Sequence, residues 1–531
     1  MADATRVLLD VVRAHLPEGG FDEDSDFYAS GGDSLIAVRV VAEARRRGLP
    51  VSLRDLLVHQ TVRAIVASGV VLDAPAGAEP GDAGDGGPFA LLAPEDRDAV
   101  PEGVEEALPM SALQTGMIYL GELSQDPALY RLLDGWEVRG PFDEGAFRTA
   151  LGALARRHPA LRTSFDFEKL SVPAQLVWAG AEPPLSVVRA DDEAAARGLL
   201  DSWGAAAGTF LDWRSPTLLR CRVVVLPGSF HVVLAAHHAL VDGWSLSLLA
   251  VELTALYRAA ADGRDAALPE PAAGVQRAFL RAEREAAESA EAAAHWLGEA
   301  GAPPLLFPPG APVGTPDARE QRAFPLGADV VAGLHRTARA RGASVKATAL
   351  AAHARALGRW RGRAHDVVTG LVFNTRPAVP GADRAAGLFL NTLPVRFDDV
   401  TGDADALVAA ASEAERRGAP YAAYPQAGLV ERLGRQAFDV VFNFMHFHAY
   451  QDTNGADGPE VRGRWRRGKP SFPFHVNLEL AGDAGEVRVG FDPDLVPPAE
   501  ADAYAALLRG ALTELAGRAV PAASHEGQVS V

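Results

Sequence analysis

The sequence contains very little cysteine: Cys221 is the one cysteine among 531 residues. A single thiol excludes an internal disulfide framework. Cys221 lies in the apolar run 218–226, so we expect a buried strand thiol there and not a nucleophile.

Basic charge is also scarce. The chain has 51 Lys and Arg residues against 69 Asp and Glu residues, which gives a formal net charge of −18. This balance argues against a nucleic-acid-binding surface, and we expect no nucleic acid as a partner. One short basic cluster, residues 462–469, is expected to form a solvated loop.

Long apolar runs are absent as well. No stretch reaches the roughly 20 apolar residues that a membrane-spanning helix needs. The first residues lack the basic start and the apolar middle of a signal peptide. We therefore expect a cytoplasmic protein in a reducing compartment, without a membrane partner. The length of the chain allows three or four domains.

The first 72 residues have the pattern of a small all-helical domain. Apolar residues recur at helical spacing in 4–16 and 35–42, and the segments 53–57 and 61–68 complete a four-helix pattern. The sequence Gly31-Gly32-Asp33 leads into Ser34 at the start of the second helix. Such a loop exposes the serine hydroxyl at a helix N-terminus, where backbone N–H groups favour a bound phosphate. The same position also suits an ordinary helix N-cap.

Residues 73–104 connect this domain to the rest of the chain. The segment 73–88 is rich in Ala, Gly, Pro and Asp and has almost no large apolar residues. This composition predicts a flexible linker. A tether for a swinging domain and a passive spacer would have the same composition.

The segment with the clearest chemical signal follows the apolar run 230–236. It reads His237-His238-Ala239-Leu240-Val241-Asp242-Gly243-Trp244-Ser245 and precedes a helical pattern over 246–257. We interpret it as a strand, a loop and a helix. Because side chains alternate along a strand, His237 and His238 should point in opposite directions, one into the structure and the other into a cavity.

Two other interpretations compete for this segment. A metal site would place its ligands along one helix face, as in H-E-x-x-H, whereas adjacent histidines on a strand cannot both face one ion. We therefore expect no metal. Two core histidines before a turn would be the interpretation if the motif stood alone.

The paired histidines followed by Asp-Gly resemble the HHxxxDG motif of condensation domains of non-ribosomal peptide synthetases. Four more segments resemble family motifs in the same order, and the Gly-Gly-Asp-Ser segment resembles that of a peptidyl carrier protein. The four segments are Leu108 to Met117, Arg157 to Phe165, Val367 to Pro377 and Gly387 to Arg396.

The resemblance implies a multidomain fold. A small all-α four-helix carrier domain, 1–72, precedes the linker 73–104. An α/β condensation domain of two chloramphenicol-acetyltransferase-like lobes follows, with the first lobe at 105–272 and the second at 273–522, before a tail at 523–531. The histidine motif would lie in a tunnel between the lobes.

The resemblance also implies roles for individual residues. Ser34 would carry covalent 4'-phosphopantetheine, and His238 would be the working histidine beside His237. The Gly243 N–H would contact an oxyanion, in a loop conformation that only glycine adopts. Asp242 would be a structural partner of Arg376. Four further residues are candidates for lining the tunnel: Trp244, Ser245, Asn391 and Asn443.

The implied reaction is amide bond formation between a carrier-bound acyl group and an amine. The carrier would need a phosphopantetheinyl transferase. An adenylation enzyme or an upstream module would load Ser34 in trans, because we find no adenylation domain. The amine would arrive on an acceptor carrier protein, which we favour, or as a free small molecule.

Three other functions share parts of this pattern. An epimerisation domain usually reads DGxSWR, where this chain has Asp242-Gly243-Trp244-Ser245-Leu246, and it needs a carboxylate motif that we do not find. A non-catalytic recruitment domain usually has a damaged histidine motif. A terminal release domain would use a free amine. The resemblance of the segment 108–117 to one version of the first family motif implies a D-configured donor.

Overall fold

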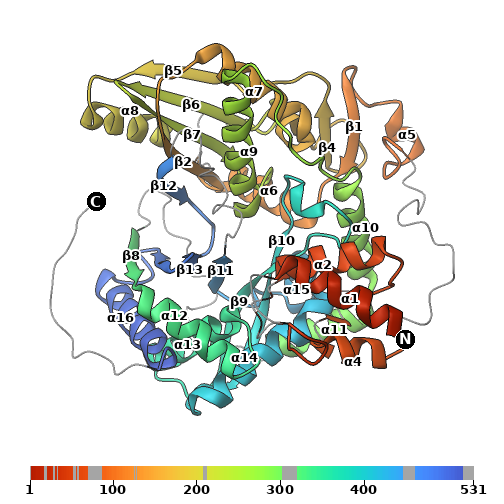
Figure 1. Cartoon of the computed structure of the whole chain (residues 1–531), viewed down its shortest axis with the longest axis vertical. Helices are drawn as coiled ribbons and strands as arrows, with labels where there is room; N and C mark the ends of the chain where they lie inside the picture. Colours follow the sequence, from red (N-terminus) through yellow and green to blue (C-terminus); the bar gives the residue numbers. More distant parts are fainter. Residues whose placement is uncertain are drawn as a thin grey trace.

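The computed structural model describes most of the chain. The described residues are 2–16, 21–27, 30, 32, 34–51, 55–56, 59–69, 87–124, 126, 128–206, 212–301, 320–446 and 461–517. Three parts are distinguished in Figure 1: a group of N-terminal helices, a lobe above and a lobe below. The tail at 523–531 lies outside the described residues.

The N-terminal helices pack around their own apolar core. They are α1 (Ala2–His15), α2 (Ser34–Arg46) and α4 (Val62–Ala67). Leu8, Val40 and Ile65, one from each helix, are fully buried in this core, as their helical spacing predicts. The helix expected at 53–57 falls partly outside the described residues.

The first lobe is built on a five-stranded sheet with the strand order β12-β2-β7-β6-β5. Its strands are β2 (Arg131–Arg139), β5 (Leu185–Arg189), β6 (Leu219–Leu226), β7 (Ser229–His237) and β12 (Val461–Gly468). Helices α7 (Glu144–Arg157) and α9 (Gly243–Ala261) pack on one face, and α8 (Glu193–Ala206) packs on the other. Cys221 is buried in β6 as predicted, and burial raises the pKa of its thiol.

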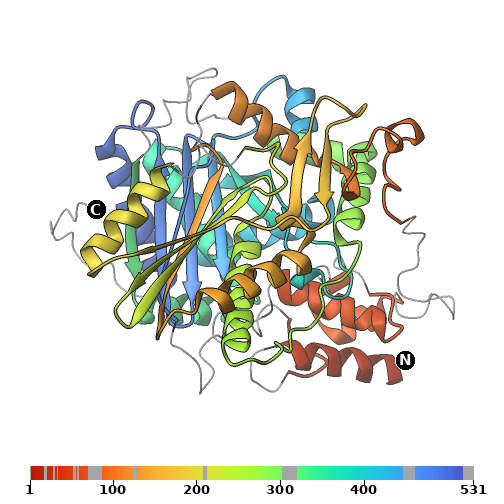
Figure 2. The same ribbon diagram turned by 90° about the horizontal axis from the view of Figure 1, so that it is seen from above.

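The second lobe is built on a six-stranded sheet with the strand order β10-β9-β11-β13-β14-β8. Seen from above, its strands run in a different direction from those of the first lobe (Figure 2). The strands are β8 (Glu320–Leu326), β9 (His365–Asn374), β10 (Leu390–Asp399), β11 (Val440–His446), β13 (Phe474–Ala481) and β14 (Ala484–Phe491). The helices are α12 (Ala328–Ala340), α13 (Val345–Arg361), α14 (Ala404–Gly418), α15 (Gln426–Leu433) and α16 (Pro498–Leu515).

Smaller elements connect the two lobes. A three-stranded sheet of β1 (Val104–Pro109), β4 (Ala174–Trp178) and β3 (Thr163–Asp166) extends the first lobe, beside α5 (Pro94–Arg97) and α6 (Ala112–Ser124). The helix expected over 275–296 is two helices, α10 (Val275–Glu288) and α11 (Ala290–Ala300), because Ser289 is extended and caps the second. Together these elements confirm the expected fold class, a helical domain followed by two α/β lobes.

The linker expected at 73–104 is described only from Gly87 onward, and residues 70–86 lie outside the described part of the chain. The described part is packed. Leu92, for example, is 3% exposed and belongs to an apolar cluster with Ala107 and Leu176. A flexible linker is therefore the wrong description of residues 87–103, because their apolar side chains pack against the three-stranded sheet.

The basic cluster 462–469 differs from its expectation. It forms β12, which pairs antiparallel with β2 and so adds a strand from the second half of the chain to the first lobe's sheet. The physical reason is a buried carboxylate. Asp134 on β2 is fully buried, and both Arg464 and Arg466 form ion pairs with it. The solvated-loop prediction is wrong because the partner of the arginines is far away in the sequence.

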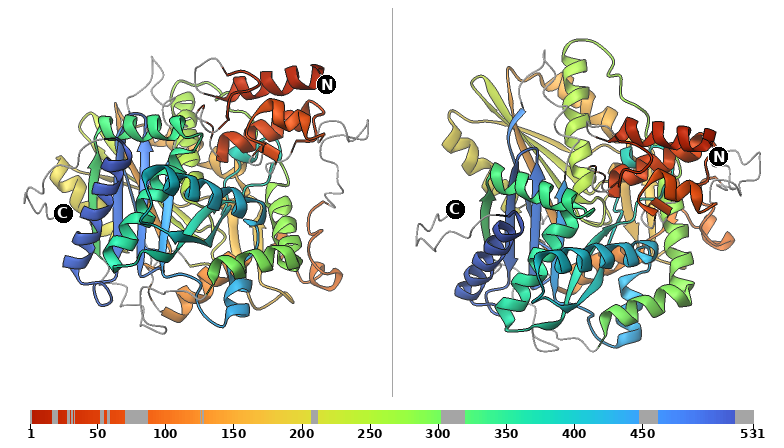
Figure 3. Two further views of the ribbon diagram at one scale, coloured as in Figure 1. Left: turned by 90° about the horizontal axis from the view of Figure 1, so that it is seen from below. Right: turned by 60° about the horizontal axis from the view of Figure 1, so that its bottom comes forward.

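The helical domain contacts the second half of the chain directly (Figure 3). Arg39 of α2 forms an ion pair with Asp383, with 2.9 Å between Nε and Oδ2. Ala378 packs against the apolar core of the helical domain. Both contact residues belong to the segment 376–387, which also reaches the histidine motif, as described below.

Candidate active site

The paired histidines lie where β7 ends. His237 is the last residue of the strand, and His238 begins the turn that leads to α9. The two backbones are fixed by the residues that directly precede β6 and β2: the His237 N–H donates to Leu218 O, and the His238 N–H donates to Tyr130 O at 2.7 Å. The expectation that both histidines belong to one strand is therefore half right. The two side chains have different environments because His237 belongs to the strand and His238 belongs to the turn.

The His237 ring is buried and its lone pair is occupied. Its Nδ1 accepts a hydrogen bond of 3.1 Å from the Ala239 N–H. Burial, together with the neighbouring His238, lowers the pKa of His237 to about 3. His237 is thus neutral at pH 7, and its contact stabilises the turn.

The His238 ring is partly exposed and has the opposite proton arrangement. Its Nδ1 lies 3.0 Å from the carbonyl oxygen of Val241. Because a carbonyl only accepts, Nδ1 carries the proton and Nε2 keeps a free lone pair. Burial lowers the pKa of His238, and Arg466 lowers it further, while Asp242 and the Val241 carbonyl oppose both.

Asp242 is the N-cap of α9, and several protein groups bind its carboxylate. Its Oδ1 accepts from the Ser245 N–H at 2.7 Å, as in a helix N-cap, and Oδ2 accepts from the Phe389 N–H. Arg376 Nη1 lies 3.1 Å from Oδ2, and the two side chains are 2% and 4% exposed. Burial acts to raise the pKa of Asp242, but Arg376 and Ser245 outweigh it, and the pKa lies below its ordinary value. The expected ion pair is present.

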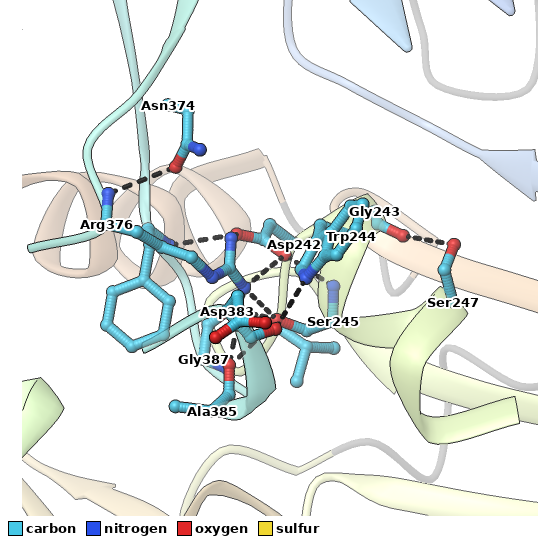
Figure 4. A network of polar contacts seen from close by, with 12 residues as sticks. Asp242, Gly243, Trp244, Ser245, Ser247, Asn374, Arg376, Asp383, Ala385 and Gly387 are labelled. Atoms are coloured by element: carbon cyan, nitrogen blue, oxygen red, sulfur yellow. Dashed lines mark hydrogen bonds and ion pairs between the residues drawn. The ribbon is translucent and has the colours of Figure 1, made fainter. Parts of the chain in front are cut away.

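Ser245 differs from its expected place in a tunnel. Its side chain is fully buried, and its hydroxyl donates to Gly387 O at 2.8 Å while it accepts from the Gly387 N–H and from Arg376 Nη2. A hydroxyl has one donor and two acceptor positions, and all three are used. Ser245 therefore connects α9 to the segment 376–387 and cannot contact a thioester oxygen in this arrangement (Figure 4).

The other tunnel candidates are also bonded to protein groups. Trp244 Nε1 donates to Asp383 O at 3.0 Å. The buried amide of Asn391 donates to Ala422 O and to Tyr424 O, which makes it a structural strut. Asn443 donates to Asn477 across β11 and β13 and stays partly exposed.

Gly243 also differs from its expectation. It is the first residue of α9 and is absent from the positions with positive φ, so its backbone conformation does not require glycine. A Cβ atom at this position would lie 3.4 Å from Nη1 of Arg466 and 3.9 Å from Sδ of Met445. Both neighbours come from the second half of the chain. Both distances are ordinary van der Waals contacts, so the space around this position does not require glycine either.

The sequence analysis missed Arg466 and Ser247 near the site. Arg466 Nη2 donates to Ser247 Oγ at 2.8 Å, and Ser247 Oγ donates to Gly243 O. The available signal was the basic cluster 462–469, whose alternating positions 464 and 466 fit one face of a strand. Within the described residues, no group of three or more His, Cys, Asp or Glu side chains could hold a metal ion, and no helix is long and apolar enough to cross a membrane.

Removing one partner of the buried ion pair should destabilise the protein. Asp242→Ala and Arg376→Ala each leave the other charge buried, at a cost of about 3 to 5 kcal/mol. We expect a clearly lower melting temperature in differential scanning calorimetry. Glu144→Ala is the matched control, because its ion pair with Arg148 is exposed and worth less than about 1 kcal/mol. Equal melting temperatures for Asp242→Ala and Glu144→Ala would contradict this assignment.

Comparisons with known proteins identify the families of both the N-terminal domain and the two-lobed domain. The family described as "Condensation domain" matches residues 104–489, and the family described as "Phosphopantetheine attachment site" matches residues 7–68. The AMB antimetabolite synthetase AmbE of Pseudomonas aeruginosa is 34% identical over 548 aligned positions, which cover 100% of this chain and 25% of that protein. The phosphinothricin tripeptide synthetase PhsC of Streptomyces viridochromogenes is 33% identical over 58% of this chain and 29% of its own length. The chain thus spans about a quarter of the length of the first of these relatives.

Solved structures agree on the fold. The first condensation domain of the calcium-dependent antibiotic synthetase has a TM-score of 0.66 at 23% identity, over 79% of this chain and 98% of that one. The family matches, the relatives and the two-lobed fold lead to one conclusion. The chain belongs to the condensation-domain family of non-ribosomal peptide synthetases, and it combines a phosphopantetheine-carrying domain with a transferase domain that forms amide bonds.

Proposed function

We propose that the chain transfers an acyl or aminoacyl group from its own carrier domain to an amine, with His238 as the working residue. The observation that carries this proposal is the hydrogen bond from His238 Nδ1 to Val241 O, which leaves Nε2 as an acceptor on a partly exposed ring. His237 cannot take this role, because its Nδ1 is occupied and its ring is buried.

Ser34 is the proposed attachment residue for 4'-phosphopantetheine. It is the first residue of α2, and the loop before it is tight: a Cβ at Gly32 would lie 2.4 Å from the Phe27 ring, so only glycine fits there. The N-terminus of α2 suits the phosphodiester. When attached, the group supplies the thiol that holds the donor as a thioester.

His238 has two tasks in this mechanism. An α-amino group has a pKa near 8, so a useful fraction of the amine is neutral at pH 7 without help. His238 Nε2 orients the amine, and it accepts the proton that the nitrogen loses as the C–N bond forms. The fixed Nδ1–H keeps the ring in the tautomer for this step. The same proton is then available for the departing thiolate.

Asp242 and Arg376 support His238 without touching the reactants. Their ion pair fixes the start of α9 against the segment 376–387, and the turn that carries His238 ends at Asp242. The Gly243 N–H remains a candidate contact for the developing oxyanion. It belongs to the first turn of α9, where helix N–H groups have no partner within the helix.

The proposed partners follow from the chemistry of the two domains. A phosphopantetheinyl transferase modifies Ser34. An adenylation domain loads it, because neither a carrier nor a condensation domain activates a carboxylic acid. The amine arrives on the pantetheine arm of a separate acceptor carrier protein.

The attachment residue is tested by modification of the full chain. Ser34→Ala should lose the pantetheine mass gain that wild type shows after treatment with coenzyme A and a phosphopantetheinyl transferase. Ser30→Ala, in the same loop, is the control and should be modified fully. A mass gain that persists in Ser34→Ala in intact-protein mass spectrometry would reject Ser34.

Substitution of His238 should affect turnover, whereas substitution of His237 should affect stability. His238→Ala should lower turnover by about a hundredfold to ten-thousandfold, the usual contribution of proton transfer, with a melting temperature near that of wild type. His237→Ala should mainly lower the melting temperature, because it removes a buried ring and its bond to Ala239. If His237→Ala melts like wild type and loses turnover while His238→Ala keeps it, the roles are exchanged.

The source of the amine is tested with one amine in two forms. With the donor loaded on Ser34, we expect faster amide formation from the amine tethered to a holo-carrier than from the same amine free in solution, because tethering orients the reactant. Product is followed by mass spectrometry, and Ser34→Ala is the background control. Equal rates would instead support a terminal release domain that takes a free amine.

A further inference from the structure

The buried side-chain amide of Gln114 connects α6 to the turn that carries His238. Gln114 is the third residue of α6 and is 2% exposed. Its Nε2 donates to the carbonyl oxygen of Ala239 at 3.0 Å. Ala239 directly follows His238, so a side chain that is more than a hundred residues away in sequence contacts the loop of the working histidine.

The contacts of the Gln114 amide fix its orientation. Its Oε1 accepts from the Ser111 N–H at 2.9 Å, and its Nε2 donates to Gln175 Oε1 at 3.0 Å as well as to Ala239 O. Both hydrogens of Nε2 are therefore used. A rotated amide would place its oxygen against the carbonyl oxygen of Ala239 and its nitrogen against the Ser111 N–H. The group that faces Ala239 is thus a donor.

The helical turn to which Gln114 belongs is itself anchored. The Gln114 N–H donates to Ser111 Oγ at 3.2 Å, which completes a capping box with the contact between the Ser111 N–H and Oε1. The Ala112 N–H donates to Glu283 of α10, with 3.2 Å to Oε2. The backbone of Gln114 is therefore held by α10 and by its own helix cap, which gives its side chain a fixed starting point.

Gln114 completes the pairing of the backbone around Ala239. The Ala239 N–H donates to His237 Nδ1 at 3.1 Å within the loop, and the Ala239 carbonyl oxygen accepts from Gln114. Ala239 is fully buried. A buried carbonyl oxygen without a donor is unfavourable, so loss of the glutamine amide should make the turn rearrange. The same turn includes Val241, whose carbonyl oxygen lies 3.0 Å from His238 Nδ1.

We propose that Gln114 is a positioning residue for His238, which holds the Ala239 carbonyl and thereby keeps the Val241 carbonyl at Nδ1 of the histidine ring. This inference rests on the proposed role of His238 and deepens it. The chemical consequence is the tautomer. With Val241 O at Nδ1, the ring proton stays on Nδ1 and Nε2 remains the acceptor; in a rearranged turn the proton can move to Nε2, and the acceptor for the amine proton is lost.

A capping role for Gln114 uses a different atom from the positioning role. The capping box needs only Oε1 as an acceptor, whereas the contact with Ala239 needs Nε2 as a donor. Gln114→Glu separates the two roles. Glutamate has the same shape, keeps the acceptor for the Ser111 N–H and suits the first turn of a helix, but its carboxylate has no hydrogen to donate.

The first measurement is the tautomer of His238 in the full-length chain. Histidine labelled with 15N is incorporated, and the His238 signals are assigned by their loss in His238→Ala. We expect wild type to carry the proton on Nδ1. In Gln114→Glu we expect the 15N chemical shifts to move toward a mixture of the two tautomers, because the Val241 carbonyl no longer stays at Nδ1.

The second measurement is hydrogen exchange, followed by mass spectrometry of peptides. The N–H groups of Leu240 and Asp242 are hydrogen-bonded in the structure. In Gln114→Glu we expect the peptide that contains them to exchange faster than in wild type, while the peptide of α6 exchanges at the wild-type rate. Neither measurement needs a substrate.

Ser111→Ala is the matched control, because it removes the hydroxyl that caps α6 and leaves Nε2 of Gln114 in place. It should speed exchange in α6 and keep the wild-type tautomer of His238. Gln114→Met, which also lacks the donors but adds no charge, replaces Gln114→Glu if that variant does not fold, and the same mixture of tautomers is expected.

Two results would overturn the proposal: a wild-type tautomer and wild-type loop exchange in the folded Gln114 variant, or an equal change of tautomer in Ser111→Ala. A failure of the proposed function would be seen elsewhere, as unchanged turnover in His238→Ala. Because the tautomer is measured without turnover, the two failures are distinguishable.

Discussion

The buried ion pair of Asp242 and Arg376 is the interaction on which the reaction centre depends. Asp242 caps α9, receives the Phe389 N–H and binds Arg376, so a single carboxylate joins the histidine loop to the segment 376–387. A carboxylate in this environment is stable only while each of these partners stays in place. The geometry of the His238 loop is therefore set by residues far away in the sequence.

Local signals were sufficient for much of the fold. The apolar alternation before His237 predicted β7, and the helical spacing after Gly243 predicted α9, because both patterns reflect the face that each element buries. The resemblance to known motifs then predicted the pair of Asp242 and Arg376, which are 134 residues apart. No periodicity within the sequence would have paired them.

The errors have one physical origin: the partner of a polar side chain cannot be read from its neighbours in sequence. Ser245 was expected to face a tunnel, but its hydroxyl is used by Gly387 and Arg376. Asn391 is similarly bound to the carbonyls of Ala422 and Tyr424. A basic run such as 462–469 is usually solvated, and here one buried carboxylate on a distant strand changes the outcome.

Two arginines thus act on the start of α9 in different ways. Arg376 and Asp242 neutralise each other, so their pair provides rigidity with little net field. Arg466 lies on β12 beside the buried Asp134, and its Nη2 donates to Ser247 Oγ on α9. The buried ion pair holds the residue that ends the His238 loop, and the contact between Arg466 and Ser247 holds the helix that follows it. Because Arg376 precedes β10 and Arg466 lies on β12, both effects require the second half of the chain to be packed against the first lobe.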